Sequence, residues 1–347
     1  MARQSRTACG ATTLTIGSDT PTDSCLSNNC APKNHAIEQA HGRQLSSSAE
    51  LTSLLSTYQT GETADTLRCS QTVIELAGGD PTKGTLIVGS PLAVALVLRG
   101  LTRWSLGRAG WRGDLDDAVA MARSTDPVTH AMVVGIKYGA AIVNGVLEAD
   151  DRAVREIEEA LQIAEGFGDD FTLAMSKHTL GFALVRREGA ADRQRGLELL
   201  AQVRDMCQHL RFPLSEIPIL DIYAARERAR CGDCDGAIPV MRKAAEDIFQ
   251  ARQLTYCVAG TGVLVETLLD RGAEGDATEA QDAADRLENL PAREAFAVRD
   301  ITLLRLRALL ARARGDEVGY RDFRDRYRDM ARTLGFEGHI AWAEAMT

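Results

Sequence analysis

The fold of this chain is indicated most clearly by the stretch Ala229-Arg230-Cys231-Gly232-Asp233-Cys234-Asp235-Gly236-Ala237. Its central Gly-Asp pair is typical of a turn between two helices, because glycine tolerates a left-handed C-cap and aspartate caps the next helix. The residues after it place apolar side chains at every third or fourth position, which predicts one face of a helix. These residues are Ala237, Val240, Met241, Ala244, Ala245, Ile248 and Phe249.

Similar turns recur along the chain. Gly113-Asp114, Gly275-Asp276 and Gly315-Asp316 repeat the pair, and Gly145 and Gly189 mark weaker copies. Successive marks lie roughly 40 residues apart, a period typical of repeats made of two helices. The order of glycine, aspartate and a later alanine resembles the turn inside tetratricopeptide (TPR) repeats. We therefore predict an all-α fold: a TPR-like helical-repeat superhelix of about six helix pairs, preceded by a disordered N-terminal segment.

Three element boundaries can be predicted from local signals. Ser90 followed by Pro91 predicts the start of a helix that ends near Leu106. The turn at 110–114 predicts the start of its partner. The tail from Gly335 to Met346 predicts one last helix, which we expect to cover the open end of the array.

Residues 1–48 differ in composition from the repeat domain predicted over residues 49–347. Threonine, serine, asparagine and glycine dominate the first segment, with no sustained apolar period, which predicts disorder. A start codon placed upstream of the true domain is an alternative explanation. Cys9, Cys25 and Cys30 raise the question of zinc, but their spacing matches zinc motifs poorly, so we expect no metal and no cofactor.

Composition excludes several classes of function. A net charge of -9 disfavours nucleic acid as a partner, because phosphate binding needs a basic face. No apolar run reaches the length of a membrane span, and the N-terminus lacks the apolar region of a signal peptide. We therefore expect a cytoplasmic protein without membrane contact.

Two local motifs suggest chemistry and are disfavoured by their surroundings. The loop from Gly78 to Gly84 lacks the Lys-Ser or Lys-Thr that completes a phosphate-binding loop. Cys231 and Cys234 form a Cys-x-x-Cys motif, but a redox site of that kind requires a preceding strand, whereas a helix is predicted here. A thiol switch at these two cysteines remains an alternative function.

Six residues recur on the first helices of successive pairs, which line the concave face of such arrays. We predict that they bind a partner. The alternative is that the two tyrosines and the histidine are packed in the interior. The leucine-alternating run from Arg305 to Arg314 is instead predicted to be a solvated helix face. The six residues are Lys137, Tyr138, Lys177, His178, Tyr223 and Arg226.

Four short stretches resemble a family. They run from Thr72 to Gly84, Ile87 to Ala93, Tyr327 to Ala331 and Leu334 to His339. They are similar to the C-terminal helical-repeat tails of actinobacterial proteins that join a class III adenylate cyclase domain to a STAND-type ATPase. The resemblance covers residues 50 to 347, and the cyclase and ATPase modules themselves cannot be found in the sequence.

The resemblance implies a non-catalytic interaction or regulatory module in signalling. It also implies protein partners that include cyclase or ATPase modules. The chain is then not expected to be an enzyme, and it could be the detached end of a longer protein. A sensor that binds a small effector in the concave cavity is the main alternative.

Overall fold

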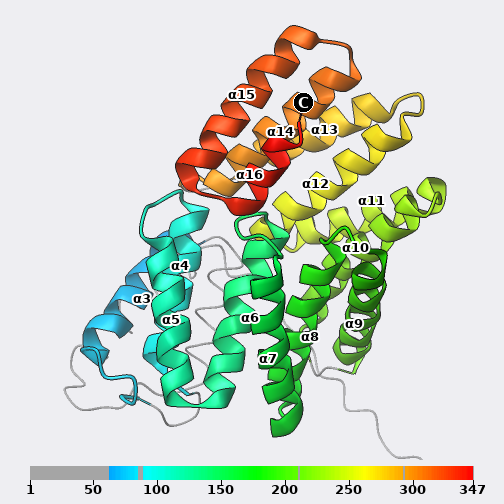
Figure 1. Ribbon diagram of the computed structural model, residues 1–347. Coiled ribbons are helices and arrows are strands. Elements are labelled where there is room, and N and C mark those ends of the chain that lie inside the picture. The colour runs from blue at the N-terminus through cyan, green and yellow to red at the C-terminus, as the bar shows by residue number, and fades with distance from the viewer. Residues whose placement is uncertain (1–61, 85–88, 210–211, 292–293, 347) are drawn as a thin grey trace, which may run out of the picture. The chain divides into compact units, whose positions relative to one another are not determined.

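The computed structural model describes residues 62–84, 89–209, 212–291 and 294–346. This part of the chain contains fourteen α-helices, one short 3-10 helix and no strand, which confirms the predicted all-α class (Figure 1). The predicted disordered segment and Cys9, Cys25 and Cys30 lie outside the described residues. The helices are α3 (Thr63–Ala77), α4 (Pro91–Ser105), α5 (Trp111–Thr125), α6 (Pro127–Val143), α7 (Asp151–Phe167), α8 (Asp170–Val185), α9 (Ala190–Gln208), η1 (Leu214–Glu216), α10 (Ile217–Arg230), α11 (Cys234–Gln250), α12 (Leu254–Arg271), α13 (Asp276–Glu288), α14 (Ala297–Ala313), α15 (Glu317–Leu334) and α16 (Glu337–Glu344).

The turn between α10 and α11 forms as its sequence predicts. Gly232 has a left-handed backbone with a φ of 99°. Asp233 then caps α11 by accepting a hydrogen bond from the backbone N–H of Gly236 at 2.9 Å. The predicted helix start at Ser90 and Pro91 is also confirmed, because the Ser90 side chain accepts a hydrogen bond from the Ala93 backbone N–H.

The prediction was wrong about the turn before α5. This helix begins at Trp111, and the left-handed residue is Gly110, with a φ of 85°. The earlier start allows the Trp111 side chain to be buried. Asp114 consequently lies inside the first helical turn, where the guanidinium groups of Arg99 and Arg103 bind it at 2.6 and 2.7 Å.

Each helix packs against the next one in the chain, and the first helices of neighbouring pairs also pack together between α4 and α6, α6 and α8, α10 and α12, and α12 and α14. The first helices are α4, α6, α8, α10, α12 and α14, and their partners are the odd-numbered helices α5 to α15. Where α8 meets α10, the rings of Phe182 and Tyr223 form an edge contact at 4.9 Å. No helix of the described segments is long and apolar enough to span a bilayer.

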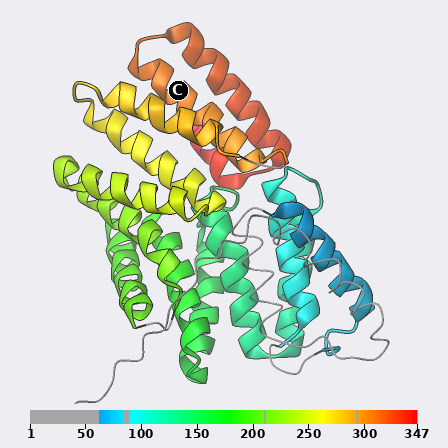
Figure 2. The same cartoon turned by 180° about the vertical axis from the view of Figure 1, so that it is seen from behind.

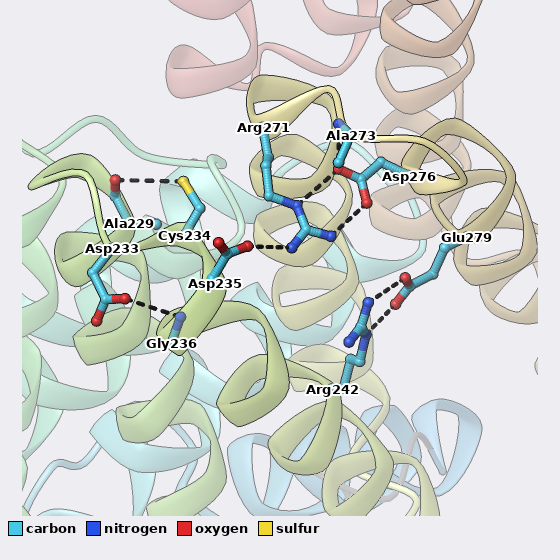
Figure 3. A network of polar contacts seen from close by, with 10 residues as sticks. All are labelled: Ala229, Asp233, Cys234, Asp235, Gly236, Arg242, Arg271, Ala273, Asp276 and Glu279. Carbon is cyan, nitrogen blue, oxygen red and sulfur yellow. Dashed lines mark hydrogen bonds and ion pairs between the residues drawn. The ribbon is translucent and has the colours of Figure 1, made fainter.

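Arginine clamps join neighbouring pairs of helices, and Figure 3 shows the one at Arg271. Arg271, at the end of α12, binds Asp276 of its own pair at 2.6 Å and Asp235 of the preceding pair at 2.8 Å. Arg187 makes the same two contacts two pairs earlier, with Asp192 of its own pair and Asp151 of the preceding pair, each at 2.6 Å. Because each clamp ties two pairs, it fixes the register of one pair on the next.

The last helix, α16, does not cover the open end of the array as predicted. It lies against the loop between α6 and α7, where the backbone N–H of His339 donates to the Gly145 carbonyl at 3.0 Å. Both views show α16 beside the end of α6 (Figures 1 and 2). Phe336, just before α16, makes edge contacts with Trp104 and Trp111. Because Phe336 is fully buried, these aromatic contacts fix the start of α16 beside α4 and α5.

Candidate functional site

Four charged side chains from four first helices meet in one place. Arg186 follows α8, Arg226 lies on α10, Glu266 on α12 and Arg305 on α14. We call these four residues the arginine cluster. In Arg226, Glu266 and Arg305 the side chain is 15%, 20% and 17% exposed, so the cluster is largely buried but still reached by solvent.

Glu266 is the single carboxylate within the cluster. Its Oε1 accepts a hydrogen bond from Arg305, and its Oε2 lies 3.8 Å from Nη2 of Arg226. Burial alone would raise the pKa of Glu266, but the charges of Arg305 and Arg226, the hydrogen bond from Arg305 and the charge of Arg186 hold it at about 2. Glu266 is therefore ionised at neutral pH.

The arginines are only partly satisfied by these contacts. Arg186 donates to two backbone carbonyls, those of Val143 at 3.2 Å and Ile142 at 3.5 Å. Burial lowers the pKa of Arg186, and the charges of Arg226 and Arg305 lower it further. The Nη1 atom of Arg226 is buried and has no hydrogen-bond partner in the described part of the chain. The cluster thus holds three guanidinium groups around one carboxylate.

Helix α16 covers one side of this cluster. The Trp342 ring lies between two of the guanidinium groups, 4.4 Å from Arg186 and 4.7 Å from Arg305. Such cation–π contacts stabilise a desolvated guanidinium. The sequence context predicted that Arg305 lies on a solvated helix face. That prediction is wrong for Arg305, because its side chain is held between Glu266 and Trp342.

A neutral histidine anchors α16 next to the cluster. The Tyr327 hydroxyl donates to Nδ1 of His339 at 2.9 Å, and Nε2–H of His339 donates to the Asn144 carbonyl at 3.0 Å. Burial, together with the charges of Arg305 and Arg186, lowers the pKa of His339 to about 3. One ring nitrogen thus ties α16 to α15, and the other ties it to the residue that follows α6.

Two of the six predicted partner-binding residues lie at the cluster. Arg226 belongs to it, and Tyr223 packs beside it with its hydroxyl 3.5 Å from the Val143 carbonyl. Lys177 donates to the Gln202 side chain at 2.7 Å, and His178 is buried 3.3 Å from Glu216. The structure therefore does not gather the six residues into one surface.

Lys137 and Tyr138 line a separate small pocket of about 140 Å³ between α5, α6 and α7. The Lys137 ammonium lies 3.3 Å from Asp116 and 3.7 Å from Glu156, and the Tyr138 hydroxyl donates to Glu156 at 2.5 Å. Both residues are buried. Their charges and hydroxyl are already paired, which favours a structural role at this position.

The Cys-x-x-Cys motif occupies the helix turn between α10 and α11. Cys231 is exposed and Cys234 is half-buried, with its Sγ 3.7 Å from the Ala229 carbonyl, and both are free thiols. A helix precedes the motif, and the described residues include neither a strand nor a group of three or more potential metal ligands. The thiol-switch hypothesis stays a prediction without further support.

Sequence reasoning missed Arg186, Glu266, Arg305 and the role of Trp342. A signal was available: Arg186, Arg226, Glu266 and Arg305 follow one another at intervals of 40, 40 and 39 residues. These intervals are close to the length of one helix pair, but the four residues lie at different points along their helices: Arg186 follows the end of α8, whereas the other three lie before the ends of α10, α12 and α14. The spacing alone therefore indicated only that one charged residue recurs in each successive pair.

Neither a protein-family model nor a curated protein matches this sequence. The functional argument therefore rests on the residues of the chain itself.

Proposed function

We propose that the chain is a non-catalytic, TPR-like interaction module with a regulatory role, similar to the tails of cyclase–ATPase signalling proteins. The observation that carries the proposal is the arginine cluster, because it places charges from α8, α10, α12 and α14 on a face shared by successive pairs. A face built in this way can contact a partner over several repeats.

The packing scheme supports the TPR-like part of the proposal. Each first helix packs on its own partner, most first helices also pack on the first helix of the next pair, and arginine clamps recur between pairs. In superhelical repeat arrays, this arrangement leaves one row of helices free to form an inner surface. We propose class III cyclase or STAND ATPase modules as the partners.

The test measures regulation directly. We expect the purified chain to change the rate of a cyclase or ATPase module encoded in the same genome by about fivefold or more, the lower range of allosteric coupling. The double variant Lys177→Gln/Arg226→Gln should lose most of this effect, because both side chains lie on first helices. Lys137 is not replaced, because its buried ammonium group is paired with Asp116 and Glu156. Its loss is expected to impair folding.

The matched control is Arg242→Gln/Arg286→Gln. These arginines lie on second helices and form exposed pairs with Glu279 and Glu246. The control should regulate like the wild type. An unchanged rate with every module would refute the regulatory proposal, and an equal loss in both double variants would refute the assignment to the first helices.

A further inference from the structure

We infer that the arginine cluster binds the phosphate or carboxylate group of a small anionic effector. This goes beyond the proposed interaction function, because it requires no protein partner. The cluster offers converging cationic donors from three helices, a partial opening to solvent and too few anions of its own.

The arginine cluster holds three positive charges and one negative charge. Removing a guanidinium from water is costly unless an anion or a full set of acceptors replaces the water. Glu266 accepts a hydrogen bond from Arg305, but at 3.8 Å it makes no hydrogen bond with Arg226. Arg186 reaches only neutral carbonyl oxygens within the described segments. Two of the three cations therefore lack a direct carboxylate hydrogen bond.

Nη1 of Arg226 is a buried donor that makes no hydrogen bond to any described residue. A buried donor without an acceptor destabilises the folded state, so it marks a place where an acceptor is missing. Because Arg226 also carries a full charge, an anionic oxygen is the acceptor that would satisfy it best.

The donor geometry and the limited access of the cluster indicate which kind of anion it would bind. Guanidinium groups present paired N–H donors that match the oxygens of a phosphate or a carboxylate. The side chains of Arg226, Glu266 and Arg305 are each at most 20% exposed. Trp342 already covers Arg186 and Arg305 from one side. The remaining access at the cluster suits a small charged group.

The residues around the cluster do not cancel its charge. Asp270 is exposed, and its pKa is raised by burial of part of the group and by the Glu266 charge. The charges of Arg226, Arg312 and Arg230 act on it in the opposite direction. Arg230 and Arg312 are offset by Asp270 and by Glu227, which binds Arg230 at 2.6 Å, so these neighbours leave the excess positive charge of the cluster unchanged.

The test is a thermal and calorimetric titration of the whole chain at constant ionic strength. Inorganic phosphate and pyrophosphate form one arm, citrate and succinate the other, and chloride is the reference. At about ten times its dissociation constant, the binding anion should raise the unfolding midpoint by about 3 °C. The arm that gives the shift identifies the effector group as phosphate or carboxylate.

Three variants make the expected signature specific. Arg226→Gln should weaken anion binding at least tenfold, Glu266→Gln should tighten it severalfold by removing the competing carboxylate, and Arg286→Gln should leave it within about twofold. If the Arg226→Gln variant does not fold, Arg226→Lys carries the test, since it keeps the charge but loses the paired donors. Equal midpoints in all anions, or unchanged affinity in the Arg226 variant, would overturn the inference.

Discussion

Replacement of Gly145 by alanine is expected to destabilise the protein by about 3 kcal/mol. Gly145 has a φ of 67°, a left-handed conformation that costs an L-residue roughly 1–2 kcal/mol. A Cβ added there would lie 2.4 Å from the Trp342 ring. The ring cannot move aside freely, because the guanidinium groups of Arg186 and Arg305 lie over it, 4.4 and 4.7 Å from its centroid, so overpacking adds about 1–3 kcal/mol.

Gly315→Ala is the matched control for this prediction. Its φ of 71° is nearly the same, but a Cβ at that position would meet nothing within 4 Å. Urea denaturation of both variants separates backbone strain from the contact with α16. A Gly145 loss no larger than the Gly315 loss would show that Trp342 does not pack against this turn. The loss of stability caused by Gly145→Ala should be smaller in a protein that already carries Trp342→Ala than in the wild type.

Acidification is expected to destabilise the protein through His339. The pKa of a histidine is about 6.5 in an unfolded chain, and the pKa of His339 is about 3 in the folded protein. Between these pH values the unfolded state binds more protons. The stabilising contribution of neutral His339 is therefore complete above about pH 6.5 and is lost progressively as the pH falls to 3. Its total is on the order of 4 kcal/mol.

The variant His339→Gln isolates this contribution. Its amide oxygen can accept from Tyr327 and its amide N–H can donate to Asn144, but it does not titrate. Stability measured between pH 7 and 4 should fall less steeply in this variant than in the wild type. The wild-type curve also includes His130, whose pKa is lowered by burial, so the difference between the two proteins is the relevant quantity. The exposed His209→Gln variant should follow the wild type, and parallel curves for His339→Gln would contradict the prediction.

The helices could be predicted from the sequence because local signals determine them. Ser90 and Asp126 each cap the helix that follows, and the apolar spacing after Ala237 places that face of α11 in the core. The start of α5 was missed because the burial of Trp111 outweighed the nearby Gly-Asp pair. This burial involves the Leu334 carbonyl and Phe336, more than 200 residues away in sequence.

The candidate site could be predicted only in part. Arg226 and Tyr223 were identified from their place on a first helix. Lys137 and His178, predicted by the same reasoning, are instead paired inside the protein with Glu156 and Glu216. Helical spacing alone cannot distinguish an inner surface from a buried face. The position of Trp342 depends on where α16 docks, which is a long-range property of the fold.

Hydrogen–deuterium exchange on the chain, alone and with a cyclase or ATPase module encoded in the same genome, tests the proposed interaction most directly. The proposed interaction predicts that the partner slows exchange in the first helices α8, α10, α12 and α14. Slower exchange confined to the second helices α9, α11 and α13, or no change in any helix, would contradict it.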